Sequence, residues 1–332
     1  MFQFDTRLCK IPEFEDVIKQ SWNRFGEIED MTVQERIICC RREISAWKRN
    51  NNINSALRIK ELSTAIDAAH SDQTSTLQQI HGLGRELIQA YRDEESFWKI
   101  KSRNMWLNEG DGNTGFFHAI IKNRIARYRL TSILDASGME VFGNQAIATE
   151  ATHYFSGLFT SNMQTDPVPT LQNIQKVVTG EMNALLTAGV TIEEIREAVF
   201  SIGGTRAPGP DGFNAAFYQR YWEIVGPTII LEVENFFVNG VMPTRWNHTN
   251  LCLIPKITQP KLMQDFRPIS LCNVTYKIIS KILVKRLKEV LSSVVSENQA
   301  AFIPRRIITD NVLIAHEVLH SLRVRKRCAN SY

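Results

Sequence analysis

The sequence predicts a mainly α-helical protein with a small β component, an α+β chain. Apolar residues recur at helical spacing over residues 12 to about 105. Two short apolar runs, 130–134 and 139–142, flank the turn-like segment DASG, a pattern typical of a β-hairpin. A strongly amphipathic run covers residues 274–295. Together these features predict several helices with one or two short hairpins.

The composition is that of a globular chain. Of its 332 residues, 43% are hydrophobic, which is enough for roughly two domains. No apolar run approaches the ~20 residues of a membrane helix, and the N-terminus lacks the apolar core of a signal peptide. The six cysteines include no CxxC pair. We therefore expect an intracellular protein without membrane attachment, with a nuclear location left open.

Charge is distributed unevenly along the chain. Residues 241–332 hold fifteen Lys and Arg against five Asp and Glu, whereas residues 1–240 hold 24 against 30. A basic C-terminal quarter on an acidic remainder favours one region that faces a polyanion. Chance clustering of solvated lysines is the alternative, and charge alone does not separate the two.

Local signals are clearest in the second half. Residues 161–170, SNMQTDPVPT, are rich in proline and small polar residues, which favours a linker. Thr191 and Glu194 have the spacing of a capping box, in which each side chain bonds the backbone N–H of the other residue at a helix start. Further elements are expected: a helix over 213–239, a strand over 251–255 and a last helix from 309 or 310 towards 325.

The helix over 274–295 carries two different faces. Its apolar side is expected to hold Tyr276, Ile279, Leu283, Leu287, Val290 and Val294. Away from that side, spacings of four, four and three residues form a cationic stripe of Lys277, Lys281, Lys285 and Lys288. Such a stripe can follow a phosphate backbone. An ordinary solvated helix face is the alternative.

Two catalytic patterns fit poorly. HEVLH, from His316 to His320, matches the zinc-protease motif, but the twelve residues after it contain no His, Asp or Glu as a third ligand. A helix surface is favoured, and a zinc hydrolase is the remote alternative. Gly110, Gly112 and Gly115 spell GxGxxG, but a charged helical segment precedes them instead of an apolar strand. We expect GDGNTG to form a turn.

A second hairpin is predicted between LCLIPK, residues 251–256, and DFRPISL, residues 265–271. It would bring Lys256 near Arg267, two cations suited to a triphosphate or a template phosphate. The earlier segment TRAPGPDGF, residues 205–213, predicts a rigid loop before a helix. It lacks the Lys-Ser/Thr ending of a P-loop.

Several of these segments together resemble one family. APGPDGF, LIPK, FRPISL with NVTYKIISKILVKRL, and NQAAFIPRRIITDNVLIAHEVLHSL occur in the order seen in reverse transcriptases of LINE-type (non-LTR) retrotransposons, especially those of plants. Upstream, FWKIKSRNMWLNEGDGNTGFFHAIIKNR and YFSGLFTS resemble the region between endonuclease and polymerase. The resemblance covers about residues 90–332. The first 90 residues fit the family's helical linker only by position.

The resemblance implies an RNA-directed DNA polymerase that acts on an RNA or DNA template and primer. It divides the chain into three parts. Residues 1–160 would be a helical linker region upstream of the polymerase, with the small hairpin near 130–142. Residues 161–190 would be a linker, and residues 191–332 a partial reverse transcriptase domain, the fingers.

The resemblance also implies roles for individual residues. Lys256 and Arg267 would contact the triphosphate of the incoming nucleotide, and Arg306 would contact the template. The family usually has glycine before that last arginine, where this chain has Arg305. Because glycine permits a positive φ, the departure puts the local turn in question.

The resemblance further implies Mg²⁺ in the full-length family, bound by palm aspartates on a Lys-x-Asp segment and an aromatic-x-Asp-Asp hairpin. This sequence shows neither segment and contains no Asp-Asp pair. We therefore expect no catalytic residue and no cofactor here, but a truncated, inactive polymerase that retains nucleic-acid binding. A domesticated nucleic-acid-binding or scaffold protein is the alternative.

Overall fold

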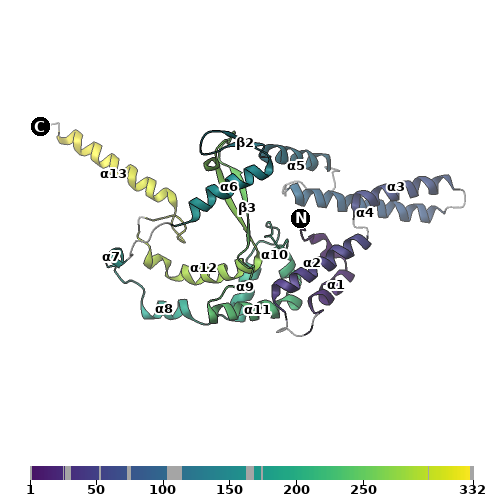
Figure 1. The fold of residues 1–332 in the computed structure, drawn as a ribbon, viewed down its shortest axis with the longest axis horizontal. Coiled ribbons are helices and arrows are strands. Elements are labelled where there is room, and N and C mark those ends of the chain that lie inside the picture. Colours follow the sequence, from purple (N-terminus) through teal and green to yellow (C-terminus); the bar gives the residue numbers. More distant parts are fainter. Residues whose placement is uncertain are drawn as a thin grey trace.

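The computed structural model describes residues 2–24, 26, 31–51, 54–72, 76–102, 114–161, 168–172, 175–297 and 299–329. Helices dominate this part of the chain (Figure 1), which confirms the predicted mainly α fold with a small β component. The first half contains η1 (Thr6–Lys10), α1 (Glu13–Trp22), α2 (Val33–Asn50), α3 (Ser55–Ser71), α4 (Leu77–Ser102), α5 (Thr114–Tyr128), β1 (Ser132–Leu134), β2 (Glu140–Phe142) and α6 (Asn144–Phe159).

The second half contains the remaining elements. They are α7 (Val168–Leu171), α8 (Gly180–Thr187), α9 (Ile192–Phe200), α10 (Ala215–Arg220), α11 (Trp222–Asn239), β3 (Thr249–Pro255), η3 (Met263–Asp265), β4 (Phe266–Cys272), α12 (Val274–Val294) and α13 (Ile308–Ala329). The two predicted hairpins are present as antiparallel pairs, β1 with β2 and β3 with β4. The expected GDGNTG turn lies almost wholly outside the described residues, as does most of the segment 161–170.

The main hydrophobic core joins the two ends of the sequence. Buried side chains from residues 4–44 and from residues 195–282 form one cluster. Trp22 of α1, for example, donates its indole N–H to Oγ1 of Thr228 in α11 at 3.3 Å. Phe4 lies 5.9 Å from Phe213 and 5.1 Å from Phe217, ring to ring. The proposed division of the chain at 161–190 remains a prediction, but η1, α1 and α2 share their core with α9–α12.

A helical pair extends from this core. Helices α3 and α4 pack against each other, and α4 packs against α5 (Figure 1). Arg7 of η1 ties the pair to the core, since its guanidinium donates to Oγ of Ser55 and to the carbonyl of Asp93, both at 3.3 Å. The same group lies 4.6 Å from the ring centre of Phe97, where a cation–π contact stabilises it.

A second, smaller core orients the β3–β4 hairpin. Ile133, Ile147 and Phe155 from the β1–β2 and α6 region cluster with Met263, which lies between β3 and β4. A backbone hydrogen bond reinforces this contact, from the N–H of Leu134 to the carbonyl of Lys261 at 2.8 Å. The β1–β2 hairpin therefore buttresses the tip of the β3–β4 hairpin.

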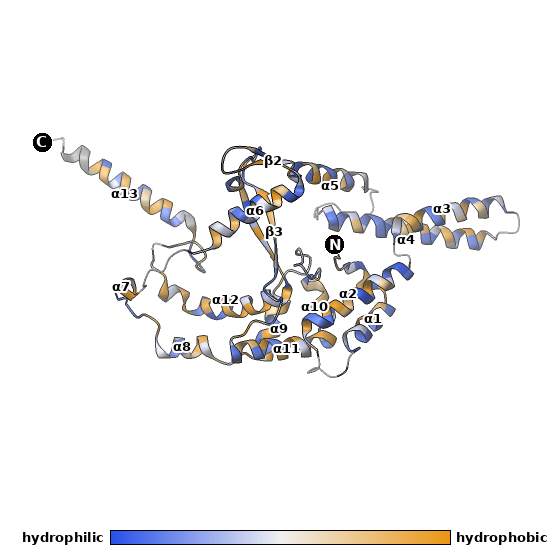
Figure 2. Ribbon diagram, in the orientation of Figure 1, coloured by the Kyte–Doolittle hydropathy of each residue, from blue (hydrophilic) through white to orange (hydrophobic). Residues whose placement is uncertain are grey.

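Helix α13 differs from the other helices because it projects from the molecule (Figure 1). Apolar and polar residues alternate along it (Figure 2), and Leu313, Leu319 and Leu322 are 60%, 55% and 55% exposed. None of the helices in the described ranges is both long and apolar enough to cross a bilayer.

Candidate nucleotide and nucleic-acid interface

The β3–β4 hairpin places two predicted site residues on one face. Ile254 pairs directly with Arg267, and the N–H of Lys256 donates to the carbonyl of Asp265 at 2.7 Å. Paired residues point to the same side of a two-stranded sheet, and alternate residues share that side. Lys256 and Arg267 therefore share one face near the tip, and both are exposed.

The tip itself is ordered by local hydrogen bonds. The Asp265 carboxylate accepts from the backbone N–H groups of Lys261 and Leu262 at 3.0 and 2.9 Å, and these bonds lower its pKa. The Lys256 ammonium donates to the carbonyl of Gln264 at 2.7 Å. That bond uses one of three ammonium donors, so Lys256 can still bond an anion.

The base of the hairpin is held by the TRAPGPDGF loop. The Asn273 side chain accepts from the N–H of Asp211 at 3.2 Å and donates to the carbonyl of Arg245 at 3.1 Å. A Cβ on Gly209 would lie 2.3 Å from Oδ1 of Asn273, so only glycine fits this approach. The predicted rigid loop thus fixes where β4 ends and α12 begins.

Asp211 is the buried carboxylate of this loop. It accepts from the N–H of Phe213 at 2.9 Å, and the hydroxyl of Tyr218 lies 3.5 Å away. Burial raises the pKa of Asp211 to about 6, against the opposing effects of these bonds and of the Lys277 charge. It is a structural group of the hairpin base and faces the core.

The lysine stripe of α12 is divided. Lys277 is half-buried, and burial lowers its pKa, whereas Lys285 forms an ion pair with Glu197 of α9. Lys281 and Lys288 are exposed and contact no acid within the described residues. Only these two lysines are therefore fully available to a phosphate backbone, and the binding role of all four remains a prediction.

The prediction of which residues form the buried face of α12 was wrong in part. Ile279 and Val290 are buried as expected, but Leu283, Leu287 and Val294 are 47%, 45% and 46% exposed. The buried face instead consists of Val274, Thr275, Ile278, Ile279, Ile282, Arg286 and Val290. The helix is rotated because this face meets α8 and α9, where an arginine takes the place of an apolar residue.

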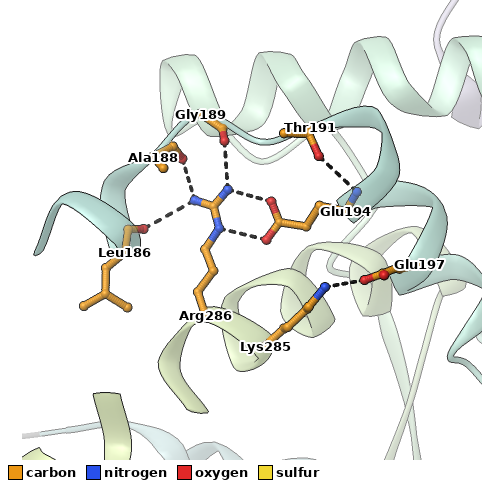
Figure 3. Close-up of polar contacts among 8 residues, drawn as sticks. All are labelled: Leu186, Ala188, Gly189, Thr191, Glu194, Glu197, Lys285 and Arg286. Atoms are coloured by element: carbon orange, nitrogen blue, oxygen red, sulfur yellow. Dashed lines mark hydrogen bonds and ion pairs between the residues drawn. The ribbon is translucent and has the colours of Figure 1, made fainter. Parts of the chain in front are cut away.

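Arg286 is the residue that pattern reasoning missed. All five of its N–H groups have partners (Figure 3). It forms two parallel bonds with the Glu194 carboxylate, at 2.9 and 2.7 Å, and donates to the carbonyls of Leu186, Ala188 and Gly189 at the end of α8. Its side chain is only 8% exposed. An arginine within an apolar stripe was the available signal, and it indicates a buried ion pair.

This ion pair changes the predicted capping box of α9. Oγ1 of Thr191 accepts from the N–H of Glu194 at 3.2 Å, which confirms half of the box. The other half was wrong, because the Glu194 carboxylate bonds Arg286 instead of the N–H of Thr191 (Figure 3). A charged, bidentate donor binds a carboxylate more strongly than a neutral backbone N–H does.

Arg306 lies at the end of α12. Its guanidinium donates to the carbonyls of Val295 at 3.4 Å, Gln299 at 2.8 Å, and Ser296. The neighbouring Arg305 has a φ of 67°, the left-handed conformation that glycine adopts without strain. The turn therefore keeps the glycine-like backbone in spite of the substitution, at a cost of about 1–2 kcal/mol.

The HEVLH segment lies on α13 with His316, Glu317 and His320 exposed. Within the described ranges, no group of three or more His, Cys, Asp or Glu is placed to hold a metal ion. The described residues thus form no group of ligands that fits the Mg²⁺ ions that reverse transcriptases use.

Comparison with known proteins points to the same part of the chain as the site described above. Residues 254–329 match the family described as reverse transcriptase (RNA-dependent DNA polymerase). This stretch contains all seven predicted site residues: Lys256, Arg267, Lys277, Lys281, Lys285, Lys288 and Arg306. This part of the chain is therefore similar to a reverse transcriptase domain, and the relatives of the chain include Pol polyproteins of retrotransposable elements.

Three proteins of transposable elements extend the similarity beyond this segment. The uncharacterized 149 kDa protein of transposon TX1 from Xenopus laevis is 29% identical over 68% of this chain. The Pol polyprotein of the type-2 retrotransposable element R2DM from Drosophila melanogaster is 24% identical over 83%, and that of the type-1 element R1 from Bradysia coprophila is 26% identical over 35%. The chain covers 17%, 25% and 12% of these relatives. The resemblance to plant elements is not tested by them.

Proposed function

We propose that this LINE-type reverse transcriptase segment forms the part of an RNA-directed DNA polymerase that holds the incoming nucleotide and the template. The observation that carries the proposal is the shared face of Lys256 and Arg267 near the tip of the β3–β4 hairpin. Two exposed cations on a preformed ribbon can bind a triphosphate without reorganising the backbone.

The template role rests on the cations that follow the hairpin. Lys281 and Lys288 lie outside the buried face of α12, are exposed to solvent and remain available to phosphates. Arg306 is half-buried and donates to the carbonyls of Val295 and Gln299, just after α12. Template contact would therefore require it to exchange one of these acceptors for a phosphate oxygen.

Nucleotide binding tests the first role. The full chain is titrated with a deoxynucleoside triphosphate and Mg²⁺, and binding is measured by calorimetry. Lys256→Ala and Arg267→Ala should each weaken binding about tenfold, whereas the matched variant Lys261→Ala, on an exposed lysine of the same turn, should not. Equal affinities of all four proteins would refute the nucleotide role.

Primer extension tests activity. From the sequence we expect no template-dependent incorporation by this chain alone with Mg²⁺ or Mn²⁺. Incorporation on a primed RNA would refute that expectation. The RNA-binding role would be unaffected, because it is measured by titration without nucleotides.

A further inference from the structure

Helix α4 carries two largely apolar rows of side chains. In the first row Ala90 is 3% exposed, and Leu83 and Leu87 are half-buried, so this row forms the seam with α3. The second row follows spacings of four, three, four and three residues, which keep it on one face of the helix. Its members, which we call the α4 stripe, are Leu77, His81, Gly84, Ile88 and Tyr91.

The face of the α4 stripe continues into positions that α5 covers. The next steps of four, three and four residues after Tyr91 reach Glu95, Trp98 and Ser102. Glu95 and Ser102 are 5% and 4% exposed, and the ring centres of Trp98 and His118 of α5 lie 3.7 Å apart. Helix α5 therefore already packs on this face, at the end of α4 nearest the core.

The α4 stripe itself is open to solvent in the part of the chain that the structure describes. Leu77, Ile88 and Tyr91 are 77%, 55% and 52% exposed, and a Cβ on Gly84 would meet nothing within 4 Å. The pair of α3 and α4 projects from the rest of the molecule (Figure 1). A third helix laid along the stripe would bury its three large apolar side chains, and Gly84 would let the two backbones approach closely.

The edge of the α4 stripe that faces away from α3 is cationic. Arg85 and Arg92 each lie one residue after a stripe position and two residues after a seam position, which puts both on that edge. Both are exposed and form no ion pair within the described ranges, whereas Glu86 pairs with Arg58 on the other side of the arm. A partner helix with acids along the matching edge would complement this charge. A second copy of this chain suits the edge less, because its own stripe carries the same two arginines.

We propose that the α4 stripe is the docking site for an acidic amphipathic helix of a partner protein, which continues the packing that α5 begins. Apolar side chains of the partner, spaced three and four residues apart, would cover Leu77, Ile88 and Tyr91. Its acidic edge would pair with Arg85 and Arg92. This interaction is separate from the proposed nucleotide and template roles, which depend on residues 256–306.

The test uses the full chain and a labelled synthetic helical peptide with leucine at heptad positions a and d and glutamate at e and g. Binding is followed by fluorescence anisotropy. Gly84→Gln should weaken binding about tenfold or more, because the new side chain stands where the peptide backbone approaches. Gly82→Gln is the matched control, since it also has open space and the same gain in helix propensity but points away from the stripe. It should bind within about twofold of wild type.

The cationic edge is tested separately. The double variant Arg85→Glu, Arg92→Glu should weaken binding of the glutamate peptide about tenfold or more and favour a matched peptide with lysine at e and g. The control Lys10→Glu, Lys19→Glu makes the same charge change at exposed positions of η1 and α1. It should leave both affinities within about twofold of wild type. Circular dichroism and the unfolding midpoint establish that each variant is folded.

Four outcomes would overturn the proposal. The first is a wild-type chain that shows no saturable binding of the glutamate peptide, and the second is an equal loss in the Gly84 and Gly82 variants. Tighter binding of the lysine peptide by wild type would refute the acidic character of the partner. A dimer of wild type in analytical ultracentrifugation that disappears in Gly84→Gln, together with peptide binding, would make a second copy the occupant. Nucleotide affinity should be unchanged in Gly84→Gln, so failure of the nucleotide titration leaves the docking proposal standing.

Discussion

Two helices of this protein begin with the same capping-box sequence but form different hydrogen bonds at their N-termini. Helix α2 follows Thr32 with Glu35 three residues on, and helix α9 follows Thr191 with Glu194. At α2 the box is complete, since Glu35 accepts from the N–H of Thr32 at 2.9 Å and Thr32 accepts from the N–H of Glu35 at 3.3 Å. At α9 only the threonine half forms.

The difference follows from what faces each glutamate. Glu35 is exposed to solvent, and the nearest strong donor is the backbone of its own N-cap. Glu194 is 15% exposed and faces Arg286, which lies 92 residues away in the sequence. The capping box thus forms completely where its glutamate is exposed to solvent. It forms only in part where the tertiary structure gives the glutamate a charged partner. The predictions below test this comparison, from the largest expected effect to the smallest.

Arg286→Ala should destabilise the chain by about 3–5 kcal/mol, because it leaves the Glu194 carboxylate and three carbonyls at the end of α8 without donors. Urea unfolding followed by circular dichroism measures it. Lys285→Ala is the matched control on the preceding residue, where both partners of the ion pair are more than half exposed, and should change stability far less. Similar losses in both variants would contradict the distinction.

The pH dependence of stability should depend on this arginine. The hydrogen bonds from Arg286 lower the pKa of Glu194 below its ordinary 4.5. A carboxyl whose pKa is depressed on folding stabilises the protein above its unfolded pKa, and the stabilisation is lost as pH falls through the folded pKa. Wild type should therefore lose more stability than Arg286→Ala between pH 5 and about 3. If the stability of both proteins changes equally with pH, Arg286 does not lower the pKa of Glu194.

The two threonine caps should behave alike. Thr32→Ala and Thr191→Ala each remove a side-chain acceptor for an N3 amide, and each should cost about 1 kcal/mol. Thermal unfolding under identical conditions compares them, with Thr→Ser variants as controls that keep the hydroxyl. A cost confined to Thr32 would mean that Arg286 has replaced the cap of α9 as well as its box.

Glu35→Ala should have the smallest effect. Its carboxylate bonds only its own N-cap and is exposed, so the unfolding midpoint should shift by about 1 °C or less. Glu194→Ala, the equivalent change at α9, should lower the midpoint several times further because it leaves Arg286 buried without its carboxylate. If the two variants shift equally, the start of α9 is no different from that of α2.

Much of the local structure could be read directly from the sequence. The β1–β2 hairpin, the β3–β4 hairpin and the helix from Val274 all form where periodicity and turn residues predicted them. The sequence also predicted that this hairpin brings Lys256 near Arg267, and the strand register of the structure then put both residues on one face. These features depend on residues close in the chain, and their physical causes are therefore visible in a short window.

The remaining features were decided by contacts between distant segments. The sequence determined that Glu194 sits at N3 of a helix, but only packing of α9 against α12 decided that its carboxylate bonds Arg286. In the same way, periodicity determined that α12 is amphipathic, and the tertiary structure decided which side is buried and left Lys281 and Lys288 outward. Which face of a helix is buried depends on the elements that pack against it. A partner distant in the sequence leaves no pattern in the residues next to the position that it contacts.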